Sequence, residues 1–345
     1  MPTSDQLSER ELRVLEAVVQ TYIETAEPAG SQTIARKFGL GVSPATIRST
    51  MSELEDKGYL FHPHTSAGRI PTDRAYRVYV DAIMRLSPPS HQEQHTLRSE
   101  LTGTRSAVEE ILRRAAQVLG VLTQELGVAV APALDQVILE RLELVQVSSE
   151  RLLLVFNLHS GVVRTIFVEV PGLLGAASVQ QVAQTLNERL SGLTLKEIRS
   201  NLPERLRDAG GSQEGRELLN IFIAEGDGLF DLSNEENAVV IGSAQMLAEQ
   251  PEFASNSRMR DLLRLTEGRD LLKQALDSRR QRGLSITIGG ENPDARLSDF
   301  TLVTSSYEAG GLKGVIGVMG PTRMPYDKII GLVEHTSRLV EGLLE

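Results

Sequence analysis

The sequence of 345 residues contains neither cysteine nor tryptophan, and aromatic residues make up only 4% of it. Without cysteine there can be no disulfide bond, thiolate metal site or cysteine nucleophile. The scarcity of aromatic side chains argues against a surface on which the bases of a single nucleic-acid strand would stack. No run of about 18 apolar residues occurs, so no membrane-spanning helix is expected. No apolar signal-peptide core follows the polar residues 1–6, which makes the cytoplasm the expected compartment.

Basic charge is scarce overall but concentrated near the N-terminus. The net charge is −10, which argues against indiscriminate binding of nucleic acid. Residues 31–85 are nevertheless net positive, with eight Lys or Arg and five Asp or Glu. Hydrophobic residues make up 41% and charged residues 24% of the chain, which is typical of a soluble globular protein. At roughly 150 residues per domain, the length predicts two or three domains.

Three helices are predicted near the N-terminus. The first begins after Ser8 and ends at Pro28, the second covers residues 31–38, and the third covers residues 44–57. A glycine-containing turn at residues 39–42 separates the last two. Two consecutive short helices joined by such a turn are typical of a helix-turn-helix. The predicted N-cap residues of the three helices are Ser8, Ser31 and Ser43.

The third predicted helix has two faces of different character. Ile47, Met51 and Leu54 recur at helical spacing and are predicted to face the core. The opposite face carries small side chains, which permit close approach to DNA, and one arginine, which can donate two hydrogen bonds to a guanine edge. On an isolated helix this pattern would indicate an ordinary solvated face, but the helix-turn-helix favours DNA contact. The candidate DNA-binding residues here are Ser43, Ala45, Thr46, Arg48, Ser49 and Ser52.

A short hairpin is predicted directly after this helix. Residues 59–61 favour a strand, residues 62–68 form a polar turn, and the chain returns at Arg69. Such a hairpin resembles the wing of a winged-helix domain, so Arg69 and His64 are candidates to approach DNA phosphate or the minor groove. The alternative for both residues is a polar hairpin tip without a role. A further helix, capped by Thr72, is predicted to run to Leu86, and Ser87-Pro88-Pro89-Ser90 is predicted to be a linker.

The remainder of the chain mixes strands and helices, which predicts an α+β region. The predicted strands are residues 142–147, 152–158, 162–170, 238–242, 284–288, 300–307 and 315–319. The predicted helical segments are about 105–126, 178–223, the stretch up to about 280, and 326–344. The predicted turns are 159–161, Gly289-Gly290 and Gly310-Gly311.

Motifs of catalysis are missing. Gly41-Val42-Ser43-Pro44-Ala45 lacks the last glycine of a nucleophile elbow, and no Walker loop occurs. His62 and His64 resemble a metal-binding pair, but no third ligand is evident. We therefore expect neither an enzyme, nor a cofactor, nor a metal site.

Several segments resemble the heat-inducible transcription repressor family HrcA, which in bacteria represses chaperone operons. The stretch 59–81 is similar to this family, above all His64-Thr65-Ser66-Ala67-Gly68-Arg69-Ile70-Pro71-Thr72. Ser43-Pro44-Ala45-Thr46-Ile47-Arg48, Gln250-Pro251-Glu252-Phe253 and Gly320-Pro321-Thr322-Arg323-Met324 are similar to further family segments. Ala75 is one departure, since the family more often has glycine there.

The resemblance implies a multidomain α+β protein. It implies a winged helix-turn-helix in residues 1–88, a GAF-like α/β domain in residues 89–134 and 236–345, and an inserted α+β dimerisation domain in residues 135–235. It also implies a homodimer that binds double-stranded DNA at an inverted-repeat operator of chaperonin operons. Its activity would depend on folding assisted by the chaperonin and would be lost on heat stress. Two alternatives stay open: a metabolite-responsive repressor with the same domains, and an enzyme with an accessory winged helix.

Overall fold

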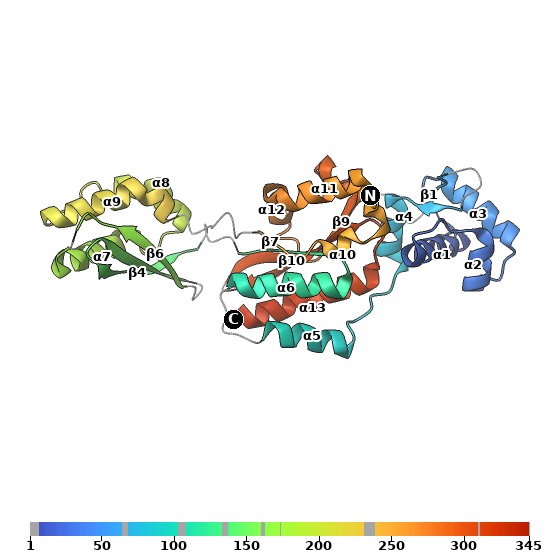
Figure 1. Cartoon of the computed structure of the whole chain (residues 1–345), viewed down its shortest axis with the longest axis horizontal. Coiled ribbons are helices and arrows are strands. Elements are labelled where there is room, and N and C mark those ends of the chain that lie inside the picture. The colour runs from blue at the N-terminus through green and yellow to red at the C-terminus, as the bar shows by residue number, and fades with distance from the viewer. Residues whose placement is uncertain are drawn as a thin grey trace. The chain divides into compact units, whose positions relative to one another are not determined.

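The computed structural model describes residues 7–63, 68–102, 108–132, 137–159, 163–172, 174–230, 239–309 and 311–344 (Figure 1). The chain divides into two compact units. Unit 1 contains residues 1–130, 240–306 and 315–340; unit 2 contains residues 131–239, 307–314 and 341–345. Both units combine helices with antiparallel strands, which confirms the predicted α+β class.

The three predicted N-terminal helices are present as α1 (Glu9–Thr25), α2 (Ser31–Phe38) and α3 (Pro44–Asp56). Ser8 caps α1 through a capping box with Glu11, and the Ser43 side chain caps α3, as predicted. The prediction that Ser31 caps α2 was wrong, because Gly30 is the N-cap and Ser31 is already helical. Helix α1 also ends earlier than predicted, because Ala26 adopts a left-handed conformation with φ of 56°.

The predicted hairpin after α3 consists of β1 (Leu60–Phe61) and β2 (Ile70–Pro71). Ala29, which precedes α2, pairs with Arg69 through two backbone hydrogen bonds of 2.9 and 3.0 Å, so a third segment joins the hairpin. Thr72 caps α4 (Asp73–Val78) as predicted. The prediction that this helix runs to Leu86 was wrong, since it widens into a π-helix, η2 (Tyr79–Ile83), and ends there.

Unit 1 contains a five-stranded sheet in the order β7-β3-β10-β9-β8. Its strands are β3 (Leu126–Val130), β7 (Val239–Ile241), β8 (Ser285–Ile288), β9 (Phe300–Ala309) and β10 (Leu312–Pro321). The prediction of helix up to residue 126 was wrong at its end, because α6 (Val108–Thr123) stops before Gln124, which has a φ of 62°. Strand β3 follows and is buried throughout, which gives it no alternation from which a strand could be predicted.

Helices cover this sheet; Figure 1 shows α6 and α13 (Tyr326–Leu344) below it and α11 (Asn256–Glu267) and α12 (Arg269–Asp277) above it. Short turns lie at α10 (Gln245–Ala248), η4 (Pro251–Phe253), η5 (Gly289–Glu291) and η6 (Ala295–Leu297). Gly289 and Gly290 therefore lie in a 3₁₀ turn of a long connection, not in the predicted tight hairpin turn. Gly311 has a left-handed φ of 80° between β9 and β10, whereas Gly310 lies outside the described residues. Helix α5 (His91–Leu101) was not predicted, although Ser90 and Glu93 form a capping box.

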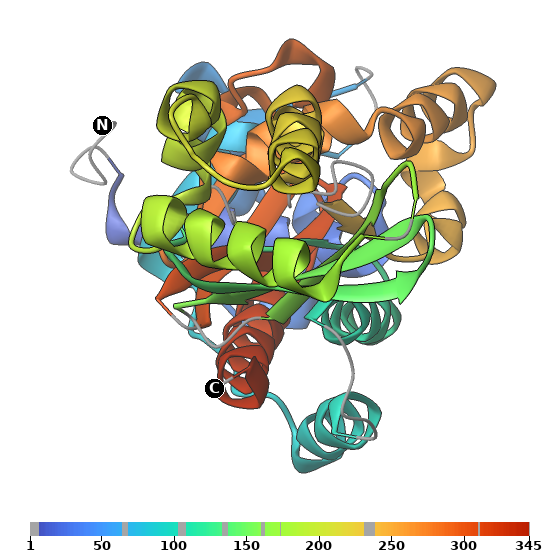
Figure 2. The same ribbon diagram turned by 90° about the vertical axis from the view of Figure 1, so that its left-hand side faces the viewer.

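Unit 2 consists of the antiparallel sheet β4-β5-β6 and three helices. The strands β4 (Leu139–Ser148), β5 (Arg151–Leu158) and β6 (Val163–Glu169) confirm the three predicted strands. The predicted helical stretch 178–223 is divided into α7 (Ala176–Leu190), α8 (Leu195–Leu206) and α9 (Gln213–Leu229). Figure 2 shows α7 along the sheet, where it contacts β4.

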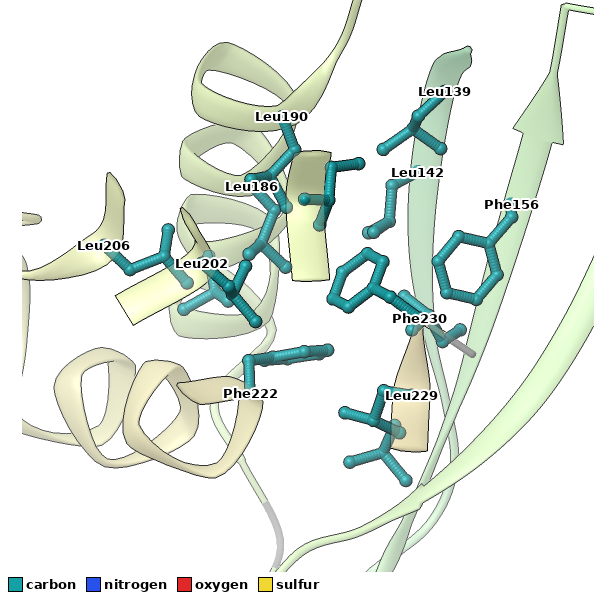
Figure 3. Packing of buried hydrophobic residues seen from close by; sticks show 14 of the residues in the cluster. Leu139, Leu142, Phe156, Leu186, Leu190, Leu202, Leu206, Phe222, Leu229 and Phe230 are labelled. Carbon is teal, nitrogen blue, oxygen red and sulfur yellow. The ribbon is translucent and has the colours of Figure 1, made fainter. Parts of the chain in front are cut away.

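The core of unit 2 fills the space between one face of this sheet and the three helices (Figure 3). Leu142 and Phe156 from the sheet meet Leu186 and Phe222 from the helices, and the ring of Phe230 stands edge-on to that of Phe156 at 5.4 Å. The other face of the sheet carries apolar side chains that are about half exposed, namely Val145, Val163 and Phe167. Unit 2 thus has its own core and a second sheet face on which half-exposed apolar side chains lie beside charged ones such as Arg151, whose guanidinium lies over the ring of Phe167.

Candidate nucleic-acid interface

Helix α3 presents the two faces that the sequence predicts. Ile47, Met51 and Leu54 are at most 3% exposed and contribute to the core. Of the candidate DNA-binding residues on or next to this helix, Thr46 is half-buried and the others are exposed: Ser43, Ala45, Arg48, Ser49 and Ser52. Arg48 has no ion pair with any residue in the described part of the chain, so its guanidinium is available to a ligand.

The N-terminus of α3 is organised by its own hydroxyl groups. Ser43 Oγ accepts a hydrogen bond of 3.2 Å from the Thr46 backbone amide and lies 3.0 Å from Thr46 Oγ1. Pro44 occupies the first helical position, where its missing N–H costs nothing. The remaining free amides of this exposed turn and the helix dipole favour an anion such as a DNA phosphate. The exposed Arg36 on α2, which sequence reasoning missed, adds a cation just before the turn into α3.

The hairpin is attached to α3 through Glu55. Arg69 Nη2 donates to Glu55 Oε2 at 2.7 Å, and His62 Nδ1 contacts Glu55 Oε1. The Arg69 Nε atom is buried and has no hydrogen-bond partner in the described structure. Arg69 therefore positions the hairpin here, and a contact with phosphate requires it to exchange from Glu55. His64 lies outside the described residues.

A second cluster brings together the segments that carry the family resemblance. Arg323 Nε and Nη2 donate to Glu252 at 2.5 and 3.0 Å, and Arg323 Nη1 donates to the Ile23 carbonyl at the end of α1 at 2.9 Å. The ring of Tyr76 on α4 lies 5.8 Å from that of Tyr326 at the start of α13. Sequence reasoning selected these segments as similar to the family but gave them no role. Spacing along the chain could not reveal contacts between residues so far apart.

Glu125 is a buried carboxyl next to this cluster. Its side chain accepts a hydrogen bond of 3.0 Å from Gln250 Nε2. Burial raises the pKa of Glu125 well above its usual value, against the hydrogen bond from Gln250 and the charge of Arg323, which lower it. Gly320 packs against this carboxyl, because a β-carbon at residue 320 would stand 2.1 Å from Glu125 Oε2 and would displace that side chain.

The described ranges contain no group of three His, Asp or Glu side chains arranged to hold a metal ion. None of their helices combines the length and the apolar character that crossing a bilayer requires.

The comparisons with known proteins decide the family. The family model described as "HrcA protein C terminal domain" matches residues 109–330. The chain belongs to the HrcA family. A heat-inducible transcription repressor HrcA from Chlorobium phaeobacteroides (strain BS1) is 40% identical over 340 residues, which cover 95% of this chain and 96% of the relative. One from Prosthecochloris aestuarii is 39% identical over 97% of this chain and 96% of the relative.

One solved structure has a similar fold. A crystal structure of a hypothetical protein covers 98% of this chain and 99% of its own length, with a TM-score of 0.67 and 23% sequence identity. At that identity the likeness concerns the fold alone. The family model therefore matches residues 109–330, whereas the curated relatives and the solved structure extend over nearly the whole chain.

Proposed function

We propose that this chain is a transcriptional repressor that binds double-stranded DNA at an inverted-repeat operator as a homodimer. The observation that carries the proposal is the exposed face of α3, where small side chains surround Arg48, which has no ion pair with any of the residues that the structure describes. Inserted into the major groove, this face lets the helix approach the base edges, and Arg48 can donate two hydrogen bonds to a guanine. The names of the relatives agree with this role.

Residues 1–88 form a winged helix-turn-helix in this proposal. Its support is the order of elements: three helices, a hairpin, and the pairing of Ala29 with Arg69 that adds a third short segment to the hairpin. Helix α3 is the recognition helix, with Ala45, Arg48, Ser49 and Ser52 facing the bases. The helix N-terminus with Ser43 and Thr46, together with His64 and Arg69 of the wing, faces the phosphates.

We assign the two remaining parts as the family resemblance implies. The GAF-like domain comprises residues 89–134 and 236–345, and the inserted dimerisation domain comprises residues 135–235. The support for the second assignment is that unit 2 has a separate core and exposes an apolar row on its sheet. Val145 pairs with Leu153, and Leu153 with Phe167, so the three side chains share that face. Such a face is suited to a two-fold interface between identical copies.

Regulation by heat follows from loss of the folded dimer. We propose that the repressor acts in the cytoplasm, represses chaperonin operons, and depends on free chaperonin to reach its active fold. When unfolded clients occupy the chaperonin, active repressor falls and the operons are expressed. A marginally stable repressor is sufficient for this control, because a loss of about 1–2 kcal/mol in the free energy of unfolding changes the folded population several-fold. No catalytic step is part of this proposal.

The experiment that tests the proposal is binding to a labelled inverted repeat from a chaperonin promoter, against a scrambled duplex, at two salt concentrations. Wild type binds the repeat tightly, and Arg48→Ala weakens this binding by about 1–3 kcal/mol without changing the melting temperature. Arg13→Ala, which removes an exposed arginine of α1, is the matched control. Equal weak binding of both duplexes by folded wild-type dimer would refute the operator assignment.

A metabolite-responsive repressor is the second candidate, and a cavity in unit 1 favours it. The cavity has a volume of about 330 Å³ and is lined by Asp73, Glu252, Asp261 and Asp299 among others. Its volume is at the lower end of those of small-molecule sites, and a cationic ligand would compete with Arg258 and Arg323, which pair with the carboxylates of Asp299 and Glu252. Under this alternative an amine such as a diamine or polyamine raises the melting temperature and changes DNA affinity. If such ligands change neither, heat-dependent folding stays the better explanation.

A further inference from the structure

Two arginine–glutamate pairs hold the N-terminal module, here residues 7–63 and 68–83, against the rest of unit 1. We call these pairs the junction clamp. In the first, Arg77 of α4 donates through Nε and Nη2 to the two carboxylate oxygens of Glu291 at 2.8 and 2.5 Å. Its Nη2 also donates to the Ile286 carbonyl at 2.9 Å. Such a forked contact fixes direction as well as distance.

The second pair of the junction clamp holds the end of α1. Arg323 binds both oxygens of Glu252 and also donates to the Ile23 carbonyl. Ile23 lies in the last turn of α1, where carbonyls lack partners within the helix, and that turn contains no basic residue of its own. Arg323 therefore satisfies one of these carbonyls and supplies the positive charge that a helix C-terminus favours.

The side chains of the junction clamp are partly buried, and other contacts between the module and the rest of unit 1 reinforce it. The side chains of Arg77 and Arg323 are only 22% and 14% exposed. Burial raises the pKa of Glu291, but hydrogen bonds from Arg77 and the Ile288 amide outweigh it and hold the pKa below its usual value, so the pair stays ionised. Asp73 accepts a hydrogen bond of 2.9 Å from the Gly290 amide, beside the packing of Tyr76 on Tyr326.

The junction clamp holds α1, which contacts the recognition helix α3, and α4, which contacts α1. Helix α4 also lies against β8 of the five-stranded sheet. Residues 84–90, which have no regular structure, connect the module to α5. The clamp acts together with the Asp73–Gly290 hydrogen bond and the packing of Tyr76 on Tyr326 to fix the direction of α3 relative to the five-stranded sheet. Removing the clamp weakens this attachment, so the module gains freedom to turn about residues 84–90.

We propose that the junction clamp determines which spacing between two operator half-sites the dimer accepts. This inference rests on the proposed function, since it requires a dimer that reads an inverted repeat. In a dimer whose units 1 and 2 keep one arrangement, two recognition helices held by the clamp fit half-sites that lie on one side of the duplex, separated by a turn of about 10.5 base pairs or its multiples. A shift by about half a turn places one half-site on the opposite side of the duplex. Freely turning modules would tolerate that shift.

The test compares full-length wild type with the double variant Arg77→Ala/Arg323→Ala. The probes are a single half-site and inverted repeats with the natural spacing or with about 5 base pairs added, which is half a turn. We expect wild type to bind the shifted repeat at least about tenfold more weakly than the natural one, and the variant to lose most of this difference. Both proteins should bind the single half-site equally. Arg85→Ala, which removes an exposed arginine of the connection, should behave as wild type.

The outcomes separate this inference from the proposed function. If wild type binds no repeat better than scrambled DNA, the proposed function fails. If wild type discriminates between the spacings and the folded double variant discriminates equally, the inference is overturned while the proposed function stands. Loss of half-site binding by the variant also overturns it, because the clamp would then maintain the module's fold. Should the double variant not fold, Arg77→Lys, which keeps the charge but loses the forked contact, must still reduce the discrimination.

Discussion

Gly68 packs so closely against Ala29 that a β-carbon at residue 68 would stand 2.4 Å from the Ala29 carbonyl oxygen. The neighbouring Arg69 pairs with Ala29 through both of its backbone polar groups, which brings the two chains together. Backbone atoms on both sides leave no flexible side chain that could move away. Glycine is therefore needed at position 68 because there is no room for a β-carbon. Backbone conformation is not the reason, since the φ of Gly68 is not left-handed.

We predict that Gly68→Ala displaces the hairpin and costs about 1–3 kcal/mol of stability, as overpacking does elsewhere. Operator affinity should fall with it, because Arg69 and the hairpin move relative to α3. Thermal unfolding and operator titration measure the two effects. Gly210→Ala is the control, since a β-carbon at residue 210 meets nothing within 4 Å. Equal melting temperatures for both variants would contradict the packing argument.

DNA phosphate and Glu55 compete for the guanidinium of Arg69, so a change at Glu55 should alter DNA binding. Glu55→Gln removes the charge that holds Arg69 and His62, so both side chains become free to meet phosphate. Non-specific DNA affinity should rise, and each added phosphate contact should steepen the salt dependence by about 0.9 in log–log slope. Filter binding over a salt series measures this slope.

A matched variant separates this effect from the general loss of negative charge. Glu53→Gln changes the same charge on the same helix, at an exposed position that does not contact Arg69. We expect it to raise affinity less and to leave the slope at the wild-type value. Adding Arg69→Ala to Glu55→Gln should abolish the gain. The interpretation fails where the two glutamine variants give the same slope.

The sequence predicted local features of the fold and the site well. The N-caps Ser8 and Ser43 and the buried and exposed faces of α3 follow from short-range chemistry that any isolated helix would obey. Segments whose structure depends on the surroundings were predicted poorly. Strand β3 is buried on both faces and shows no alternation, so it was taken as the end of a helix. The widening of α4 into η2 has no sequence signal that we recognise.

Contacts between distant segments were beyond prediction from one sequence. Arg77 with Glu291, and Arg323 with Glu252, join residues whose separation along the chain carries no periodicity. The similarity to the HrcA family marked Arg323 and Glu252 as part of a pattern, but only the fold shows that they meet at the end of α1. The pairing of Arg69 with Glu55 likewise required the hairpin to be in place.

The exposed apolar sheet face of unit 2 predicts the dimer interface. We expect Val145→Glu, at a position 48% exposed, to leave the protein folded but monomeric, because a charge would enter the centre of the interface. Affinity for the inverted repeat should fall towards that of a single half-site. Analytical ultracentrifugation gives the oligomeric state. Ser200→Glu places the same charge at an exposed position of α8, which packs on the opposite face of the sheet. The protein with this control substitution should stay dimeric. A dimeric Val145→Glu would place the interface elsewhere.

The buried carboxyl of Glu125 predicts a pH dependence of stability. Its pKa is raised in the fold, mainly by burial, so the folded protein keeps a proton that the unfolded chain releases above its ordinary pKa of 4.5. The contribution of Glu125 to stability is therefore greatest below that pH and is lost as the pH rises towards the folded pKa. Glu125→Gln, which keeps an acceptor for Gln250, should be more stable than wild type at neutral pH.

The advantage of Glu125→Gln should shrink as the pH falls to about 4.5, because wild type is then protonated in both states. Urea denaturation of both proteins across this range measures it. Glu125→Met removes the titration but also the hydrogen bond from Gln250, so it should have the same flattened pH profile at lower stability. A constant difference between wild type and Glu125→Gln at all pH values would mean that the fold leaves the pKa of Glu125 unshifted, with Arg323 and Gln250 balancing its burial.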